Sequence, residues 1–374
     1  MRRTPIPEIP ILMVCLAYLI AGVGFAQPRA AGEIDLVKAW EYRLGSDAPE
    51  TLAADNERFF LGMAGAKITA LSNDGKQVWA TELGGEITSN ITTLDTGVYV
   101  MTSASNGPKG SAVAVLRSLS KETGVTNWKI DLPESQGGYL GGANGNLIVI
   151  SKSGVIRSID PKGGGLRWKR EVADGFAGAP LFDRDRLIIA TSTNQIFAIR
   201  LNSGEIDSMR KVNFGVTCLG VTTAGELVVG DERGNLYMPE NSAEKSWKFK
   251  TGGEISGISA IGDHLLVTSH DNFVYFVGSR NGGLVWKKRL AGRVAQIATH
   301  MDNYAFITTV DSHGAVVVDL SNGKVAGQVP FTENEVLIAP PASGDSLVVL
   351  LTTEAAYGFC INACSKHKEG GQAK

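Results

Sequence analysis

The hydrophobic pattern of this chain consists of short apolar runs rather than long amphipathic periods. Between Trp247 and Trp286 the runs are Ile255–Ile261, His264–Ser269, Phe273–Gly278 and one that begins at Leu284. Runs of this length, rich in Val, Ile, Phe and Tyr and separated by Gly, Asn and Asp, predict β-strands. Four strands in about 40 residues correspond to one blade of a β-propeller.

Tryptophans mark the repeat along the chain. They occur at Trp40, Trp79, Trp128, Trp168, Trp247 and Trp286. Successive positions lie about 40 residues apart if Ser208 fills one gap in the series, and the next period falls on Ala326. A glycine three or four residues before most of these positions supports this register. The interval before Trp128 is longer, and Ser103–Ala112 has the composition of an inserted loop.

The last blade has no fourth strand of its own. Three runs follow Ala326, at Leu337–Ala339, Leu347–Leu351 and Ala355–Cys360, before the chain becomes polar. The strand around Trp40, in contrast, has no three strands before it. Because an open repeat sheet would leave pairing edges exposed, we expect the N-terminal strand to complete the last blade. The sequence therefore predicts an all-β, closed propeller of four-stranded blades, eight in preference to seven.

We expect the six tryptophans to be structural. One indole at a fixed place in each blade can bury its ring against the neighbouring blade while its N–H reaches a backbone acceptor. An aromatic binding platform would instead gather these residues at one site. The lysines that follow several of them, such as Lys129 and Lys169, are expected to be solvated charges on the outer edge.

The N-terminal segment differs from the rest of the chain. Arg2 and Arg3 precede an apolar run from Ile11 to Phe25, and small residues follow. This pattern is typical of a secretory signal peptide, and the run is shorter than the roughly 20 residues that span a bilayer. We predict a cleaved signal at 1–26, a short linker at 27–33, the propeller at 34–361 and a polar tail at 362–374. Retention of the first segment as an anchor is the alternative.

The charge and the cysteines of the chain bear on its possible partners and on its cross-links. The 374 residues carry a formal net charge of −2 without a basic block, which gives no electrostatic case for binding nucleic acid. Cys218 lies in an apolar run and is expected to be a small core residue. Cys360 and Cys364 are close enough to form a disulfide in an oxidising compartment, and their spacing leaves open whether they do.

No residue set has the pattern of a metal, cofactor or catalytic site. His264 and His270 lie six residues apart along one predicted strand, roughly 20 Å, which is too far for one ion. The three glycines from Gly163 to Gly165 precede a strand rather than a helix, so they do not form a phosphate cradle. We expect no catalytic, cofactor-binding or metal-ligating residue and no cofactor.

The repeat resembles the quinoprotein-type (PQQ-like) propeller repeat. The segments SKETGVTNWKIDL, DPKGGGLRWKREV and SRNGGLVWKKRL each place Gly three or four residues before Trp and a basic residue after it. WD40 repeats, in contrast, close on Trp-Asp after an upstream Gly-His. The resemblance covers about Ile34 to Ile361 and implies the propeller fold.

Within that superfamily, this chain is similar to the short, exported, single-domain members of the BamB type. These are scaffolds of the outer-membrane β-barrel assembly machinery. This resemblance implies a non-catalytic periplasmic scaffold, peripheral to the outer membrane, whose partners are other envelope proteins. We expect a monomer with no membrane span in its mature form. The lipoprotein cysteine usual in that family has no counterpart, since Cys15 lies inside the apolar run.

A pyrroloquinoline quinone-dependent dehydrogenase is the enzymatic alternative, and a ligand-binding or sensory propeller is another. The resemblance to such dehydrogenases would imply adjacent cysteines over the cofactor and a calcium ligand set. No two cysteines here are adjacent. Because a shared fold does not transfer chemistry, the scaffold is preferred.

The inserted loop provides the candidate partner contact. Affinity would come from loops at one rim of the ring, because the blade cores serve stability, and the candidate residues of this loop are Ser103, Asn106, Pro108 and Lys109. A loop tip without function is the alternative.

Overall fold

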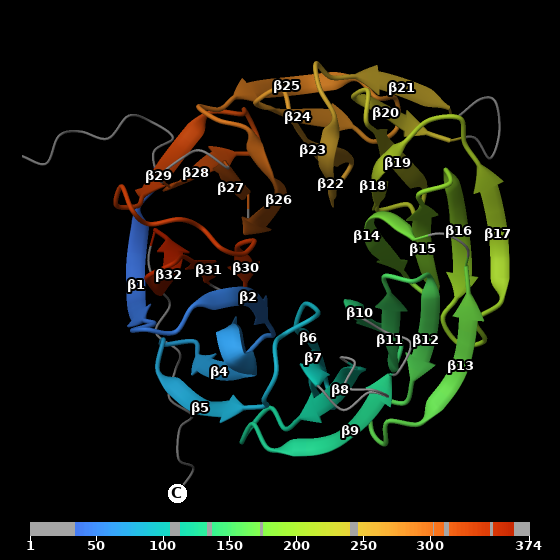
Figure 1. The fold of residues 1–374 in the computed structure, drawn as a ribbon. Coiled ribbons are helices and arrows are strands. Elements are labelled where there is room, and N and C mark those ends of the chain that lie inside the picture. The colour runs from blue at the N-terminus through green and yellow to red at the C-terminus, as the bar shows by residue number, and fades with distance from the viewer. Residues whose placement is uncertain are drawn as a thin grey trace, which may run out of the picture. The chain divides into compact units, whose positions relative to one another are not determined.

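A computed structural model of the chain describes residues 34–104, 113–132, 137–172, 175–239, 246–301, 303–309, 314–344 and 347–362. The described residues all belong to one compact unit. Within the described residues, eight four-stranded antiparallel sheets follow one another around a ring (Figure 1). The all-β, eight-bladed propeller predicted from the sequence is therefore confirmed.

Blades 1 to 4 each run from the innermost to the outermost strand along the chain. A short 3-10 turn, η1 (Ala64–Ala66), lies between the second and third strands of blade 1. The strands of these blades are β2 (Pro49–Ala54), β3 (Arg58–Met63), β4 (Lys67–Ser72), β5 (Gln77–Glu82), β6 (Thr92–Leu94), β7 (Gly97–Ala104), β8 (Val113–Leu119), β9 (Thr126–Leu132), β10 (Gly138–Ala143), β11 (Asn146–Ser151), β12 (Val155–Ile159), β13 (Leu166–Glu171), β14 (Phe176–Asp183), β15 (Arg186–Thr191), β16 (Gln195–Arg200) and β17 (Ile206–Lys211).

Blades 5 to 7 repeat this order, and blade 8 combines the two ends of the described chain. The strands of these blades are β18 (Val216–Val221), β19 (Leu227–Asp231), β20 (Asn235–Met238), β21 (Trp247–Lys250), β22 (Ile255–Ile261), β23 (His264–Ser269), β24 (Phe273–Gly278), β25 (Leu284–Arg289), β26 (Val294–Met301), β27 (Tyr304–Thr309), β28 (Gly314–Asp319), β29 (Val325–Pro330), β30 (Ala342–Ser343), β31 (Val348–Leu351), β32 (Ala355–Ile361) and β1 (Leu36–Arg43).

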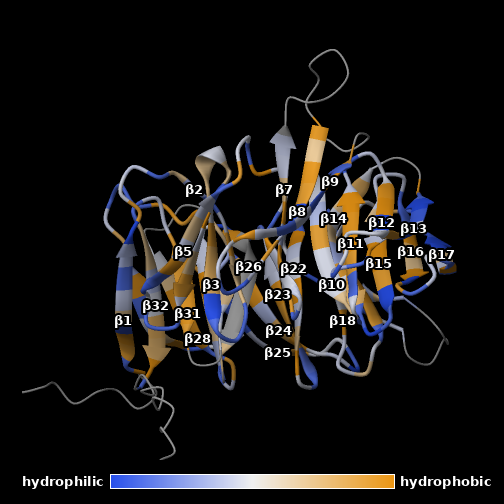
Figure 2. Cartoon of the chain, turned by 90° about the horizontal axis from the view of Figure 1, so that it is seen from below, coloured by the Kyte–Doolittle hydropathy of each residue, from blue (hydrophilic) through white to orange (hydrophobic). Residues whose placement is uncertain are grey.

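The residue pattern of each strand follows its place in the blade. The middle strands, such as β23, are almost continuously buried because both of their faces are covered by neighbouring blades. The outermost strands, such as β25, alternate between partly buried and exposed side chains because one face meets solvent. Figure 2 shows the same separation, with apolar residues along the middle strands and polar residues at many connecting loops.

The N-terminal strand closes the ring. β1 pairs antiparallel with β32, from Leu36 opposite Ile361 to Arg43 opposite Ala355. The two strands lie side by side although they stand at opposite ends of the described chain (Figure 1). The Ile34 N–H also donates to the Ala326 carbonyl of blade 7 over 3.1 Å. The predicted completion of the last blade by the N-terminal strand is confirmed.

One strand lies away from its predicted position. The innermost strand of blade 8 was expected at Leu337–Ala339, but β30 forms at Ala342–Ser343, and Leu337 makes only an isolated bridge. Pro340 and Pro341 separate the two places. Because proline has no backbone N–H to donate, regular pairing resumes only after this pair.

The hydrophobic core is divided among the seams between consecutive blades. Each of the eight clusters of buried apolar side chains joins two neighbouring blades. At the closing seam, for example, Trp40 of β1 packs with Phe59 of blade 1 and Val349 of blade 8. The blades therefore depend on their neighbours for burial, as in other repeat folds.

Candidate partner-binding site

The six tryptophans lie at six of the eight seams. Each comes from the outermost strand of one blade, and its indole N–H donates to a backbone carbonyl of the next blade in the ring. The pairs are Trp40 with Asn73 (2.9 Å), Trp79 with Lys121 (2.6 Å), Trp128 with Pro161 (3.0 Å), Trp168 with Leu201 (2.8 Å), Trp247 with Ser279 (3.0 Å) and Trp286 with Leu320 (2.8 Å). Their contribution to stability remains a prediction.

A glycine of the next blade lies against each indole. These glycines have positive φ angles, and a Cβ built on any of them would lie 2.5–3.0 Å from a ring atom of the tryptophan. They are Gly75, Gly124, Gly164, Gly204, Gly282 and Gly323. Each of these glycines stands three or four residues before the next marker position of the repeat, which is Ser208 for Gly204 and Ala326 for Gly323, and it contacts the tryptophan of the preceding blade.

The candidate partner loop is only partly within the described residues. Ser103 belongs to β7 rather than to a loop: its N–H donates to the Glu86 carbonyl (2.8 Å), and its hydroxyl accepts from the Glu86 N–H (3.1 Å). These bonds extend the strand beyond its predicted end. Asn106, Pro108 and Lys109 lie outside the described residues, so the contact role of this loop stays a prediction.

Of the two cysteines predicted to be close enough to pair, only Cys360 lies within the described residues. Cys360 is buried in β32, with its sulfur 3.7 Å from the Val37 carbonyl of β1, whereas Cys364 lies outside the described residues. Cys360 is disulfide-bonded, and because its partner lies outside the described residues, the pairing with Cys364 stays a prediction. Burial raises the pKa of the Cys218 thiol to about 12, which keeps this side chain protonated and poorly nucleophilic at neutral pH.

The titratable groups of the described residues do not form a metal cluster. No three His, Cys, Asp or Glu side chains among those residues lie close enough together to hold an ion. His264 stacks on Phe276, with ring centroids 4.6 Å apart, and His270 lies 3.6 Å from the Glu254 carboxylate.

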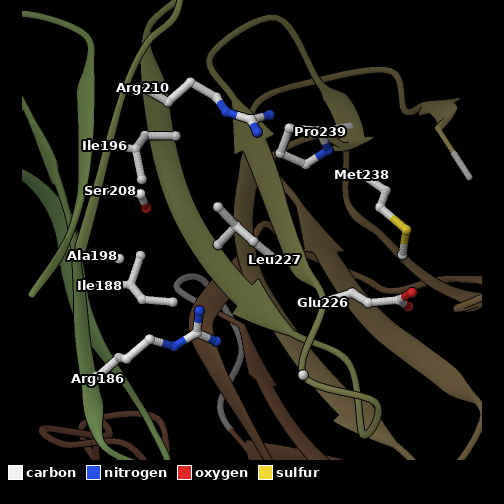
Figure 3. Close-up of a pocket in the computed structure, with 11 residues that line it drawn as sticks. Arg186, Ile188, Ile196, Ala198, Ser208, Arg210, Glu226, Leu227, Met238 and Pro239 are labelled. Atoms are coloured by element: carbon white, nitrogen blue, oxygen red, sulfur yellow. The ribbon is translucent and has the colours of Figure 1, made fainter. Parts of the chain in front are cut away.

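The seam between blades 4 and 5 has an open cavity. Ser208 of β17 occupies the strand position that tryptophan holds elsewhere, opposite Ala198. A cavity of about 200 Å³ lies beside it. Its walls include Ile188 and Ile196 of blade 4 and Leu227 of blade 5. We call this space the inner cavity. In Figure 3 the blade 4 side chains Ile188, Ile196 and Ala198 lie across the cavity from Leu227 of blade 5.

A wider groove adjoins the inner cavity. This outer groove has a volume of about 780 Å³, and it shares Arg210, Met238 and Pro239 with the inner cavity. Phe214 and Tyr237 in its lining stack with ring centroids 4.8 Å apart. The two spaces together, which we call the seam groove, provide apolar and aromatic surface that opens toward solvent.

A hydrogen bond to Asp231 holds Tyr237 in place. Its hydroxyl donates to the Asp231 carboxylate over 2.9 Å, and the Asn235 side-chain amide donates to the same oxygen over 2.7 Å. Burial alone would raise the pKa of Asp231, but these hydrogen bonds outweigh it and lower the pKa. Burial and the Asp231 carboxylate raise the pKa of Tyr237 to about 12. Asp231 is therefore ionised and Tyr237 neutral at neutral pH, which maintains a charge-assisted hydrogen bond.

Basic side chains surround the seam groove. Arg186 and Arg210 extend from blade 4 toward blade 5 at opposite ends of the inner cavity (Figure 3). Arg186 is paired with Asp183, at 2.5 Å. Lys211 and Lys248 line the outer groove, and the Lys248 ammonium lies 5.0 Å from the centre of the Tyr237 ring. Among the described lining residues, Glu226 carries the only carboxylate.

Sequence reasoning did not identify the seam groove, although one signal for it was present. The interruption of the tryptophan series at Ser208 marks this seam, and the interruption at Ala326 marks the seam between blades 7 and 8. A second groove of about 540 Å³, lined by residues such as Leu36 and Phe331, lies at that other seam. A gap in the series therefore points to a groove at the ring's outer edge.

Comparisons with known proteins support the predicted resemblance. A family model described as outer membrane protein assembly factor BamB matches residues 112–244. BamB of Shewanella oneidensis is 22% identical over 262 residues, which cover 62% of this chain and 61% of that protein. BamB of Yersinia pestis is 20% identical over 359 residues, which cover 89% of this chain and 91% of that protein.

Solved structures share the same fold. BamB of Moraxella catarrhalis superposes with a TM-score of 0.69 at 15% identity, covering 89% of this chain and 100% of that one. The quinohemoprotein alcohol dehydrogenase of Comamonas testosteroni gives a TM-score of 0.66 at 12% identity, covering 91% of this chain and 78% of that one. The resemblance to the quinoprotein-type propeller repeat and to BamB-type proteins is confirmed. In the described part of the chain, no helix has the length and apolar character to span a membrane.

Proposed function

We propose that this chain is a non-catalytic, exported propeller that binds partner proteins as a scaffold in outer-membrane protein assembly. The observation that supports this most is the extent of the similarity. Proteins named as outer-membrane assembly factors match this chain over 89% of its length. A match over nearly the whole ring relates the complete architecture, rather than one repeat, to proteins of that name.

The geometry of the ring suits a binding role. Six seams are joined by an indole N–H bond to the next blade, and the last blade is closed by β1. Such a ring can present surfaces to partners without ordering them first, which lowers the entropic cost of association. The seam groove combines aromatic, apolar and basic side chains at one place, and aromatic residues and arginine are the types that dominate protein interfaces.

The proposal includes a location and a processing step. A signal peptide at 1–26 would direct the chain to the periplasm, where the propeller would act as a monomer near the outer membrane. Partners would be other envelope proteins, and the seam groove and the loop at 103–112 are the two candidate contact surfaces.

The dehydrogenase alternative rests on fold alone, because the quinohemoprotein is only 12% identical. We expect that pyrroloquinoline quinone with Ca²⁺ neither raises the melting temperature of the purified chain nor supports dye-linked oxidation of alcohols or sugars. Ligand-dependent stabilisation together with turnover would establish the enzyme instead.

Crosslinked purification tests the proposed function. The tagged chain is crosslinked in native envelopes, purified under denaturing conditions and analysed by mass spectrometry, with an equally abundant exported protein as the control. We expect components of the β-barrel assembly machinery to be enriched with this chain over the control. If they are recovered equally with both baits, or with neither, outer-membrane assembly is the wrong context.

A further inference from the structure

The seam between blades 4 and 5 lacks a buried aromatic side chain. Within the described residues, the other seven hydrophobic clusters each contain at least one buried Trp, Tyr or Phe. The buried members of this cluster are Ile188, Ala190, Ile196, Ala198, Val216, Leu219 and Val229. The inner cavity therefore lies at the seam where the chain supplies no buried aromatic ring; Phe214 packs against this cluster but is only partly buried.

The other seam without a tryptophan is filled by the chain. Ala326 is 2% exposed there, and it packs in one cluster with Ile34 and Phe359. A Cβ on the neighbouring Gly327 would lie 2.7 Å from the Leu36 side chain. The N-terminal segment thus covers the place that an indole would occupy. Ala326 does not line the groove at its own seam, whereas Ser208 lines the inner cavity, so open space directly beside the residue that replaces tryptophan occurs at Ser208 and not at Ala326.

The inner cavity has the size and walls for an aromatic ring. An apolar cavity of about 150 Å³ is enough to bind benzene. The inner cavity measures about 200 Å³, and Ile188, Ile196 and Ala198 in its wall are each less than 8% exposed. Ser208 itself is exposed, so a ring can enter from outside the propeller.

The charges around the seam groove favour an acidic occupant. Arg210, Lys211 and Lys248 line the described part of the groove, against the single lining carboxylate of Glu226. Arg186 also lines it, but its charge is paired with Asp183. The whole chain, in contrast, has a formal net charge of −2. This local excess of positive charge would attract carboxylates and repel a basic segment.

A molecule that fills both the inner cavity and the outer groove has to be longer than one aromatic ring. The outer groove shares three lining residues with the inner cavity and has about four times its volume, so a molecule seated in the cavity continues into the groove. The stacked pair of Phe214 and Tyr237 offers apolar surface to that continuation, and Lys211 and Lys248 offer charge. A peptide segment meets both requirements.

We propose that the seam groove binds an acidic segment of a partner protein, which inserts one aromatic side chain into the inner cavity beside Ser208. The segment supplies the ring that the chain supplies itself at six other seams. Its carboxylates lie near Arg210, Lys211 and Lys248. The inference rests on the proposed function only in that the occupant is a protein, and it does not require a partner from outer-membrane assembly.

Calorimetric titration of the purified full chain tests this proposal. The probe is an acetylated peptide of sequence Gly-Asp-Trp-Asp-Gly, and the expected Kd is in the range of about 0.1–1 mM. We expect replacement of its Trp by Ala, or of both Asp by Lys, to weaken binding at least about tenfold, because each removes one of the two recognised features. Absence of binding, or equal binding of the three peptides, would overturn the proposal.

Two variants of β17 form a matched pair. Ser208→Trp places an indole of the chain at the inner cavity and is expected to abolish binding of the peptide. Met209→Trp adds the same side chain at the next residue, which is 58% exposed and does not line the groove, and should bind as the natural chain does. Unchanged binding by Ser208→Trp would contradict the proposal.

A third variant covers the case in which Ser208→Trp does not fold, as judged by its melting temperature. Arg210→Glu reverses a charge at the junction of the two spaces, and we expect it to weaken binding at least about tenfold. Binding equal to that of the natural chain would overturn the proposal.

The peptide titration tests the groove, and the crosslinked purification tests the proposed function, so that one proposal can fail while the other stands. Peptide binding without recovery of assembly components would remove the outer-membrane context and keep the groove as a binding site. Recovery of those components by a chain that binds no peptide would keep the function and remove this site.

Discussion

Deletion of residues 34–44 is expected to unfold the propeller under conditions in which the complete chain is folded. The deletion removes β1, the fourth strand of blade 8, and leaves β32 as an exposed edge. It also removes three buried side chains, Ile34, Trp40 and Leu44. At about 1.5–3 kcal/mol for each large apolar side chain, this loss alone approaches the 5–15 kcal/mol by which domains are stable.

The deleted segment, β1 with the residues that flank it, contacts three blades, which is why its loss exceeds that of one strand. The Ile34 N–H bonds to blade 7, the strand pairs within blade 8, and the Trp40 indole bonds to Asn73 of blade 1. Thermal unfolding followed by circular dichroism measures the effect. Deletion of 366–374 serves as the control and should change the stability by less than about 1 kcal/mol. Similar melting temperatures for the two truncated chains would show that β1 does not close the ring.

Trp79→Ala is expected to lower the free energy of unfolding by about 3–5 kcal/mol. The Trp79 side chain is 7% exposed, packs at the seam between blades 1 and 2, and donates its N–H to Lys121. Its replacement leaves a cavity and an unpaired carbonyl at that seam. Chemical denaturation measures the difference. A loss below about 1 kcal/mol would contradict the structural role of the tryptophans.

The glycine that lies against the Trp79 indole allows a more specific test of the structural role of this tryptophan. Gly124 and Gly45 both have positive φ, so alanine at either costs about 1–2 kcal/mol in backbone strain. A Cβ at Gly124 would meet the Trp79 ring and the Thr81 hydroxyl, each at 2.5 Å, whereas nothing lies within 4 Å of a Cβ at Gly45. We expect Gly124→Ala to destabilise more than Gly45→Ala, and the excess to be smaller in a Trp79→Ala background, where only the Thr81 contact remains. Equal costs, or additive effects, would show that Gly124 does not hold the indole.

The fold could be predicted because its signals are local and repeated. In blade 6 the apolar runs coincide with β22, β23 and β24, since turn residues mark both ends of each strand. Closure by the strand at Trp40 followed from counting strands. The prediction failed at β30, where the apolar side chains of Leu337–Ala339 suggested a strand but Pro340 and Pro341 interrupt pairing.

The candidate site could be predicted only in part. Ser208 and Ala326 interrupt the tryptophan series in the same way in the sequence. Their surroundings differ because Ile34 and Leu36, nearly 300 residues away along the chain, cover Ala326 in the closed ring. The sequence pattern holds no signal for such a contact. The grouping of Arg186, Arg210 and Lys248 around Ser208 likewise depends on how two blades meet.

Site-specific photocrosslinking in native cells tests most directly whether this propeller binds a partner at the seam groove. A photoreactive phenylalanine derivative replaces Lys248, which lies over Tyr237 in the groove, or Lys287, which lies over Phe273 at the same place in the next blade. Both lysines are exposed on outermost strands. We expect position 248 to yield a covalent adduct with an envelope protein and position 287 to yield none. No adduct at 248, or equal adducts at both positions, would contradict the account.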